Sequence, residues 1–180
     1  ADMNIAIIHY WLTSMRGGEK VLETLCEMFP DADIFTHVLD RKGLSGTINA
    51  HQIKATFINK LPFARRKYPY YLPLMPMALE RIDLRGYDLV ISSESGPAKG
   101  VLTPTNTPHI CYCHTPMRYL WDLHHDYMDG MNPFVRILSR PLFHYLRLWD
   151  VLSSNRVDRF VANSAFVAKR IERTYRRDAV

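Results

Sequence analysis

Apolar runs and segments of helical periodicity alternate along the chain. Compact apolar runs predict six strands, at residues 3–9, 34–39, 53–57, 87–93, 110–113 and 159–162. Apolar residues at helical spacing predict a helix over residues 18–29, which Pro30 ends, and a longer helix over residues 132–154. Strands that alternate with helices are typical of right-handed βαβ units, in which helices cover both faces of a parallel sheet. The pattern therefore predicts an α/β fold, a three-layer sandwich with a central parallel sheet.

The predicted helix over residues 132–154 has a large apolar face, which we expect to be buried. That face consists of Phe134, Ile137, Leu138, Leu142, Tyr145, Trp149 and Leu152. Pro141 lies within the segment, and because proline has no N–H to donate, it should kink or restart the helix.

A last helix should follow the strand at residues 159–162, with Asn163 or Ser164 as its cap. Its apolar face would consist of Phe166, Val167, Ile171 and Tyr175. The cations of this helix gather toward its end, and they are Lys169, Arg170, Arg173, Arg176 and Arg177. There they would complement the helix dipole, which is the simplest explanation of the charge run.

The composition is that of an ordinary globular protein of 180 residues, with 47% hydrophobic and 23% charged residues. No apolar run reaches the roughly 18 residues of a membrane span, and no signal peptide is recognisable at the amino terminus. The net charge of +5 favours an anionic partner, but it does not choose among nucleic acid, phospholipid and phosphorylated substrate. The chain ends at residues 178–180 as though a strand had just begun, so we expect a further domain to follow.

Residues 110–122 run from a predicted strand directly into polar and aromatic side chains. Pro116 cannot extend the ladder of hydrogen bonds, so His114 should lie at the carboxyl edge of the sheet. Ligands of open α/β sheets bind outside that edge. His114 is therefore a candidate site residue, with Arg118 a short turn further on. The alternative is that His114 only caps the strand or bonds a neighbouring carbonyl.

Two adjacent glycines, Gly17 and Gly18, open the first predicted helix. Free N–H groups at a helix start favour an anion, and glycine lets a bulky ligand approach the backbone. The surrounding residues match neither G-x-G-x-x-G nor a P-loop, so neither a dinucleotide site nor a Walker-type ATP site is predicted. The pair is also compatible with an ordinary turn, but it should share the carboxyl edge of the sheet with His114.

The three cysteines do not suggest a disulfide framework, and a reducing cytoplasm is the simplest setting for them. Cys111, Cys113 and His114 are residue types that bind zinc. Structural zinc sites, however, pair C-x₂₋₄-C knuckles with a second ligand pair downstream, and that spacing is missing. We therefore expect free thiols, with Cys111 and Cys113 as small core residues, and no metal.

Residues 57–81 combine cations with aromatic side chains. Lys60, Arg65, Arg66 and Lys67 alternate with Phe63, Tyr68, Tyr70 and Tyr71, and prolines at 62, 69, 73 and 76 exclude a long helix. Such a surface favours an anionic bilayer, to which each cation contributes about 1 kcal/mol. A crossover loop whose aromatics pack on the domain is an equal alternative. Single-stranded nucleic acid also uses such surfaces, but no binding motif is present and no nucleic-acid partner is expected.

Four motifs together resemble the family-four glycosyltransferases of the GT-B fold. They are Gly-Gly-Glu-Lys after the first strand, Tyr-Asp-Leu-Val-Ile-Ser-Ser, Cys-Tyr-Cys-His-Thr-Pro-Met-Arg-Tyr-Leu-Trp-Asp, and Val-Ala-Asn-Ser followed by Ala-Lys-Arg-Ile. The resemblance covers nearly the whole chain, and its specific parts are His-Thr-Pro-x-Arg-Tyr and the Asn-Ser helix start. It implies that residues 1–180 form one Rossmann-like, acceptor-side domain, and that a carboxyl-terminal donor domain is absent from this chain.

The resemblance also implies an activity, namely retaining transfer of a hexose from a nucleotide-sugar donor to an acceptor hydroxyl without a metal. Gly17 and Gly18 match the loop that approaches the donor, and His114 matches the histidine that contacts the donor sugar and stabilises the transition state. Arg118 and Thr115 are then contacts to phosphate or acceptor. The variant His-Thr-Pro-Met-Arg-Tyr-x-Trp-Asp resembles bacterial polysaccharide mannosyltransferases, which implies GDP-mannose as donor and a glycan or lipid-linked acceptor.

Such an enzyme would be cytoplasmic and peripheral on the inner face of the cytoplasmic membrane, and the isolated domain would be inactive. A non-catalytic module that binds a membrane or another anionic partner through residues 57–81 is the alternative. The residues that follow position 180 would separate the two, because the resemblance assigns the basic phosphate-binding pair and the glutamates of the family to the next domain.

Overall fold

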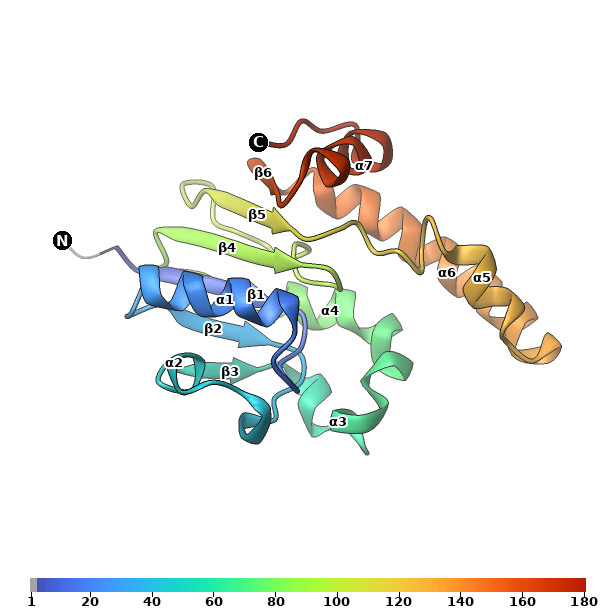
Figure 1. Ribbon diagram of the computed structural model, residues 1–180, viewed down its shortest axis with the longest axis horizontal. Helices are drawn as coiled ribbons and strands as arrows, with labels where there is room; N and C mark the ends of the chain where they lie inside the picture. Colours follow the sequence, from blue (N-terminus) through green and yellow to red (C-terminus); the bar gives the residue numbers. More distant parts are fainter. Residues whose placement is uncertain (1–2) are drawn as a thin grey trace.

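Six parallel strands form the central sheet of the computed structural model, which describes residues 3–180 (Figure 1). In chain order they are β1 (Ile5–His9), β2 (Asp33–Thr36), β3 (Ile53–Ala55), β4 (Leu89–Glu94), β5 (His109–Cys113) and β6 (Arg159–Ala162). Their order across the sheet is β3-β2-β1-β4-β5-β6, and every neighbouring pair is parallel. This is the order of doubly wound, Rossmann-like sheets, so the predicted fold class is confirmed.

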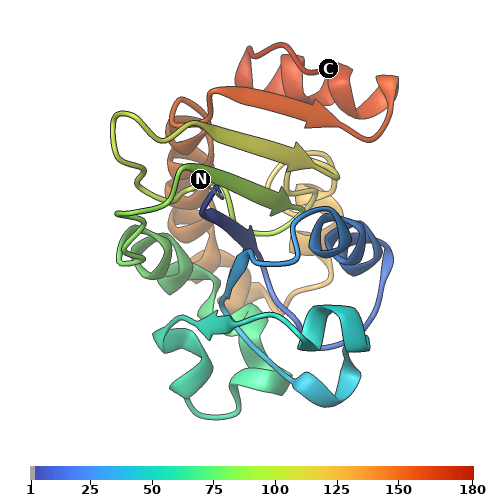
Figure 2. The same cartoon turned by 90° about the vertical axis from the view of Figure 1, so that its left-hand side faces the viewer.

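Helices of very different lengths accompany the sheet. The longer ones are α1 (Gly17–Met28), α6 (Pro133–Ser154) and α7 (Ala165–Tyr175). The shorter ones are α2 (Gly46–Asn49), α3 (Ala64–Lys67), α4 (Met75–Glu80) and α5 (His124–Asp129), with 3-10 turns η1 (Arg41–Gly43), η2 (Phe57–Lys60) and η3 (Tyr68–Leu74). Figure 2 shows α1 on one side of the sheet and α4 and α6 on the other. Between residues 3 and 180, no helix has the length and apolar character that crossing a membrane requires.

Apolar side chains are buried on both faces of the sheet, because successive residues of a strand point in opposite directions. On β1, Ile5 and Ile7 belong to the core that α1 covers, together with Leu22. Ala6 and Ile8 belong to the core beneath α4 and α6. Burial on both faces explains why the strands are nearly continuous apolar runs in the sequence.

The second and third strands are shorter than the sequence predicts. β2 ends at Thr36 and not at residue 39, and β3 ends at Ala55 and not at residue 57. After β2 the chain turns toward the loop that follows β1, where Leu12 N–H donates to the Val38 carbonyl at 2.8 Å. The apolar residues beyond Thr36 therefore pack beside that loop and do not extend the sheet.

The segment of residues 57–81 folds into short helical pieces, η2, α3, η3 and α4, as its prolines require. Ile58, Ala64, Met75 and Ala78 form a small core with Val38. The segment is therefore a folded crossover that packs against the carboxyl end of β2.

The apolar face that the sequence predicts for α6 is mostly wrong. Five of its seven residues are exposed, namely Phe134 (70%), Ile137 (63%), Leu138 (61%), Tyr145 (49%) and Leu152 (62%). The helix instead buries Phe143, Leu146, Trp149 and the polar Asp150. Apolar residues surround much of this helix, so periodicity alone could not identify its inner face. That face is decided by the contacts of α6 with the rest of the domain.

α6 continues through Pro141 without a break, so the predicted restart does not occur. Proline leaves the carbonyl oxygen of Ile137 without its usual partner. Ile137 and Pro141 are both exposed, so water can satisfy that oxygen at little cost.

α7 begins as predicted, with the Ser164 hydroxyl accepting a hydrogen bond from the Val167 N–H at 3.2 Å. Phe166, however, is 69% exposed and does not belong to its buried face. Of the cations near its end, Arg173 lies in the last turn, as complementing the helix dipole requires, while two others have specific partners, Arg170 with Asp122 and Arg177 with backbone carbonyls. Arg177 donates to the carbonyls of Ser154 and Val157 and so binds the carboxyl end of α6.

Candidate functional site

Three neighbouring strands end at one place on the carboxyl edge of the sheet. His9 at the end of β1 pairs with Ser93 of β4, and Glu94 pairs with Cys113 at the end of β5. The direction of the strand order reverses between β1 and β4, and ligands of doubly wound sheets bind at such a switch point. α1 begins at this edge as well, so its free N–H groups belong to the same crevice.

Gly18 and His114 are neighbours in this crevice. A Cβ atom built on Gly18 would lie 3.6 Å from Nε2 of His114 and would collide with the Tyr10 hydroxyl. A Cβ atom on Gly17 would meet nothing within 4 Å. The predicted juxtaposition with His114 is therefore confirmed for Gly18, while the roles of Gly17, Gly18 and His114 in binding stay predictions.

A chain of buried hydrogen bonds runs from α1 to His114 through side chains that the sequence reasoning missed. Nε2 of His9 lies 3.4 Å from Oε1 of Glu19, and Nδ1 of His9 lies 3.1 Å from the Ser93 hydroxyl. The same hydroxyl lies 2.8 Å from Nε2 of His114. Polar residues at the ends of apolar strands, His9 and Ser93, were the signal that could have found this chain.

The protonation states of Glu19 and His9 determine which group donates and which accepts in each of these hydrogen bonds. Burial works against ionisation of Glu19, but its hydrogen bond with His9 and the amide of Arg16 bring its pKa below the usual value. An ionised Glu19 can only accept, so Nε2 of His9 carries the proton. Burial lowers the pKa of His9, which keeps that ring neutral and leaves Nδ1 to accept from the Ser93 hydroxyl. The Ser93 oxygen then accepts a hydrogen bond from Nε2–H of His114.

His114 is consequently a neutral ring with a defined tautomer. Burial is the main cause that lowers its pKa to about 4, with a smaller contribution from the neighbouring His9. Since Nε2 donates to Ser93, the lone pair of Nδ1 is the remaining hydrogen-bonding group of the side chain. A neutral acceptor of this kind suits a ligand hydroxyl.

Two residues that follow His114, Thr115 and Arg118, differ in how available their side chains are to a ligand. The Thr115 hydroxyl donates to the neighbouring Pro116 carbonyl at 3.0 Å, so in this structure it serves its own turn. Arg118 is exposed, and within residues 3–180 its guanidinium has no hydrogen-bond or ion-pair partner. Arg118 is therefore the more available of the two predicted contacts for a phosphate or an acceptor.

A fully buried cluster of charged side chains contacts the loop of residues 114–123. The Lys99 ammonium contacts Oε1 of Glu94 at 2.8 Å and also the Asp150 carboxylate. Asp150 accepts further hydrogen bonds from the Trp121 indole at 2.8 Å and from the Tyr175 hydroxyl at 2.9 Å. Burial alone would discharge Lys99, but the two carboxylates raise its pKa and keep it charged. The cluster thus ties the loop of residues 114–123 to α6 and α7.

The four cations predicted to face a membrane, Lys60, Arg65, Arg66 and Lys67, are all exposed on η2 and α3. Among their aromatic neighbours, Phe63 and Tyr70 are also exposed, whereas Tyr68 and Tyr71 pack against the small core of this segment. The exposed cations, Phe63 and Tyr70 fit the interpretation as a membrane-binding surface, whereas Tyr68 and Tyr71 fit the interpretation as a packed crossover loop. Binding to a membrane stays a prediction.

Cys111 and Cys113 lie in the core with Phe160, as predicted, and all three cysteines of the chain have free, buried side chains. The hydrogen bond between Cys111 and Cys113 and their burial raise the pKa of the Cys113 thiol. Within residues 3–180, no group of three or more His, Cys, Asp or Glu side chains lies close enough together to hold a metal ion.

The fold defines a doubly wound α/β domain with a candidate ligand site at its switch point. The family model described as Glycosyltransferase Family 4 matches residues 15–180, and the chain therefore belongs to this family. Among solved structures, the lipopolysaccharide outer core galactosyltransferase WaaB in its apo form matches with a TM-score of 0.50 and 14% identity. The match covers 99% of this chain but only 44% of WaaB, and it indicates the shared fold. No curated protein sequence matches this chain.

Proposed function

We propose that this chain is the acceptor-side half of a retaining glycosyltransferase, which moves a hexose from a nucleotide sugar to an acceptor hydroxyl. The observation that supports this most is the crevice itself, where Gly18 of the α1 amino terminus lies next to a neutral His114 in a member of Glycosyltransferase Family 4. In this proposal the donor-binding groups of a following carboxyl-terminal domain complete the site across a cleft.

Each side chain then has a distinct role. The first N–H groups of α1, at Gly17 and Gly18, stabilise the negative charge that grows on the leaving phosphate. Nδ1 of His114 accepts a hydrogen bond from a hydroxyl of the transferred sugar and orients its ring. Ser93, His9 and Glu19 are positioning residues, because they hold His114 in the tautomer that leaves Nδ1 free.

The finer parts of the proposal concern substrates and location. We take GDP-mannose as the first donor to test and a glycan or lipid-linked molecule as the acceptor, with no metal required. The enzyme would work on the cytoplasmic membrane from its inner face, with Lys60, Arg65, Arg66 and Lys67 toward anionic lipid. Without a second domain, the chain would instead be a non-catalytic module that binds a membrane or another anion.

A donor panel tests the proposal directly. The protein that continues beyond residue 180 should release nucleoside diphosphate from one of GDP-mannose, UDP-galactose and UDP-glucose in the presence of acceptor, and EDTA should not inhibit it. NMR of the product should show the anomeric configuration of the donor. Residues 1–180 alone should show no transfer, and transfer at the rate of the longer protein would refute the two-domain proposal.

Replacing Gly18 with valine should raise the KM for the donor by about tenfold or more, because the side chain pushes the Tyr10 hydroxyl into the crevice. Gly46→Val is the matched control, since that glycine also opens a helix and a Cβ atom there meets nothing within 4 Å. Steady-state kinetics on both variants would check this. Equal KM values would mean that the donor does not approach α1.

A further inference from the structure

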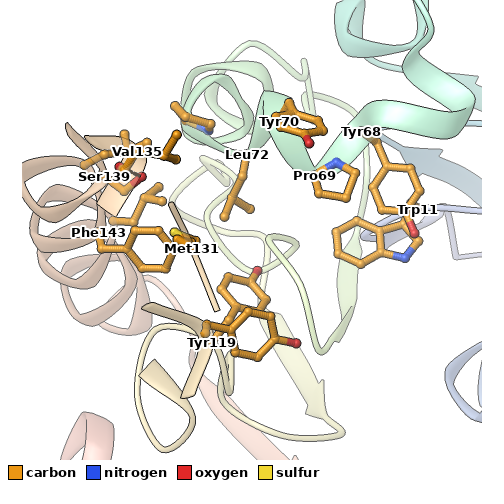
Figure 3. A pocket seen from close by; sticks show the side chains of 14 residues that line it. Trp11, Tyr68, Pro69, Tyr70, Leu72, Tyr119, Met131, Val135, Ser139 and Phe143 are labelled. Carbon is orange, nitrogen blue, oxygen red and sulfur yellow. Dashed lines mark hydrogen bonds between the residues drawn. The ribbon is translucent and has the colours of Figure 1, made fainter. Parts of the chain in front are cut away.

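An apolar pocket of about 520 Å³ lies between the turn η3 and the amino-terminal half of α6 (Figure 3). Its wall includes Trp11, Leu72, Tyr119, Leu142 and Phe143. None of the side chains that line it is charged, and its polar groups are tyrosine hydroxyls, the Trp11 indole and Ser139. The volume lies within the range of about 300–1,000 Å³ that is usual for small-molecule sites.

Two residues that line the pocket, Trp11 and Tyr119, are chain neighbours of residues at the crevice of the proposed active site. The Trp11 ring at one end lies 4.8 Å from the Tyr10 ring and 4.7 Å from the Tyr68 ring. The Tyr10 hydroxyl in turn lies over Gly18. On another wall, Tyr119 directly follows Arg118, whose guanidinium is exposed, and both belong to the loop that starts at His114.

Cations outnumber carboxylates in the segments that line the pocket, although α5, which supplies Tyr127, also carries Asp126 and Asp129, and Asp129 lies 3.6 Å from Arg136. Residues 57–79 and residues 130–149 contain no aspartate or glutamate. They contain seven cations, namely Lys60, Arg65, Arg66, Lys67, Arg136, Arg140 and Arg147. An apolar pocket with cationic surroundings complements a molecule that combines a hydrocarbon chain with an anionic group.

We propose that this pocket binds the hydrocarbon chain of a lipid-phosphate acceptor. The phosphate of that lipid contacts Arg118, and the sugar it carries reaches His114, since the loop of residues 114–119 joins the pocket to the crevice. That this lipid is the acceptor of the reaction rests on the function proposed above. The binding of an anionic lipid in the pocket does not depend on that function. Exposed Phe134 and Leu138 of α6 provide an apolar rim beside the lining residues Val135 and Ser139.

Isothermal titration of the chain with farnesyl phosphate, farnesol and inorganic phosphate tests this binding mode without any nucleotide sugar. Farnesyl phosphate should bind about tenfold more tightly than farnesol, the difference that one charge-assisted contact contributes. Arg118→Gln should remove that difference and leave farnesol affinity unchanged. An equal loss for both ligands, or no binding of farnesyl phosphate to the wild type, would overturn the proposal.

A variant whose side chain fills the pocket distinguishes binding inside the pocket from adsorption of the lipid to exposed apolar surface. Ser139→Trp should weaken farnesyl phosphate binding by about tenfold or more, because the indole occupies the space of the chain. Leu148→Trp is the matched control, since Leu148 is exposed on the opposite side of the same helix. Thermal melting would show that both variants are folded. Equal binding by Ser139→Trp and wild type, or equal losses in both variants, would refute the assignment.

The longer protein separates this inference from the proposed function. Loss of farnesyl phosphate binding when the chain continues beyond residue 180 would mean that a later segment fills the pocket, which overturns the inference. Sugar transfer to a lipid-free acceptor without any lipid binding would also overturn it and leave the proposed function intact. Lipid binding without turnover of any nucleotide sugar would support the pocket and contradict the proposed function.

Discussion

Replacing Lys99 with methionine should lower the free energy of unfolding by about 3–5 kcal/mol, the cost of breaking a buried ion pair by removing one partner. Methionine has a similar length, so packing changes little, but Glu94 and Asp150 are left as two buried carboxylates without a cation. Urea denaturation at neutral pH measures the difference. Lys20→Met is the control, because the pair of Lys20 with Glu23 lies on the surface and should contribute little to stability.

The pH dependence of this loss follows from the direction of the pKa shift. Burial raises the pKa of Glu94 even with Lys99 present, and removal of the ammonium would raise it further. A carboxyl group whose pKa is raised by folding stabilises the protein at low pH and loses that contribution as pH increases. The difference between wild type and Lys99→Met should therefore shrink from pH 8 to pH 5. A difference that is constant over this window would mean that the cluster is not charged.

Replacing His114 with alanine in the longer protein should lower kcat by about 10² to 10³, the effect of losing one preorganised hydrogen-bonding group, with little change in KM. His144→Ala is the control, since that histidine is exposed on α6. Ser93→Ala should cost about tenfold, because it removes one hydrogen bond that orients the ring. Steady-state kinetics of the three variants would check whether kcat falls most in His114→Ala, less in Ser93→Ala and not in His144→Ala.

The pH profile gives a second test of the same residue. Burial lowers the pKa of His114 to about 4, so the ring stays neutral and its acceptor is present throughout the range above pH 5.5. We therefore expect that titration of His114 does not lower kcat between pH 8 and pH 5.5, so the pH profiles of the wild type and His114→Ala should have the same shape in this range. A loss near pH 6.5 that disappears in this variant would show that the ring titrates and is not the neutral acceptor.

Much of the fold could be read from local pattern. The six strands were expected within a few residues of their observed ends, because burial on both faces leaves continuous apolar runs. The positions of Gly18 and His114 followed from topology alone, since each comes directly after a parallel strand and such strands end at one edge. These inferences needed only the residue types and their order.

Other features could not be read in this way. The buried face of α6 was predicted incorrectly because apolar residues surround much of the helix, and the charge of Asp150 gives no sign in the sequence that its side chain is buried. It is buried only because Lys99, 51 positions away in the chain, meets it beneath the crevice. Likewise the partners that orient His114 come from β1, α1 and β4, which periodicity treats as separate elements.

The parallel α/β sheet, the sheet edge that carries the candidate site and the family of the chain all follow from the order of its residues. Spacing along the chain controls these properties, because strand burial and helix starts depend on neighbouring residues. The hydrogen bonds that orient His114, the inner face of α6 and the apolar pocket beside Trp11 became known from the three-dimensional structure. Each of these depends on contacts between residues that are distant in the chain, and the free energy of such contacts does not appear in any local pattern.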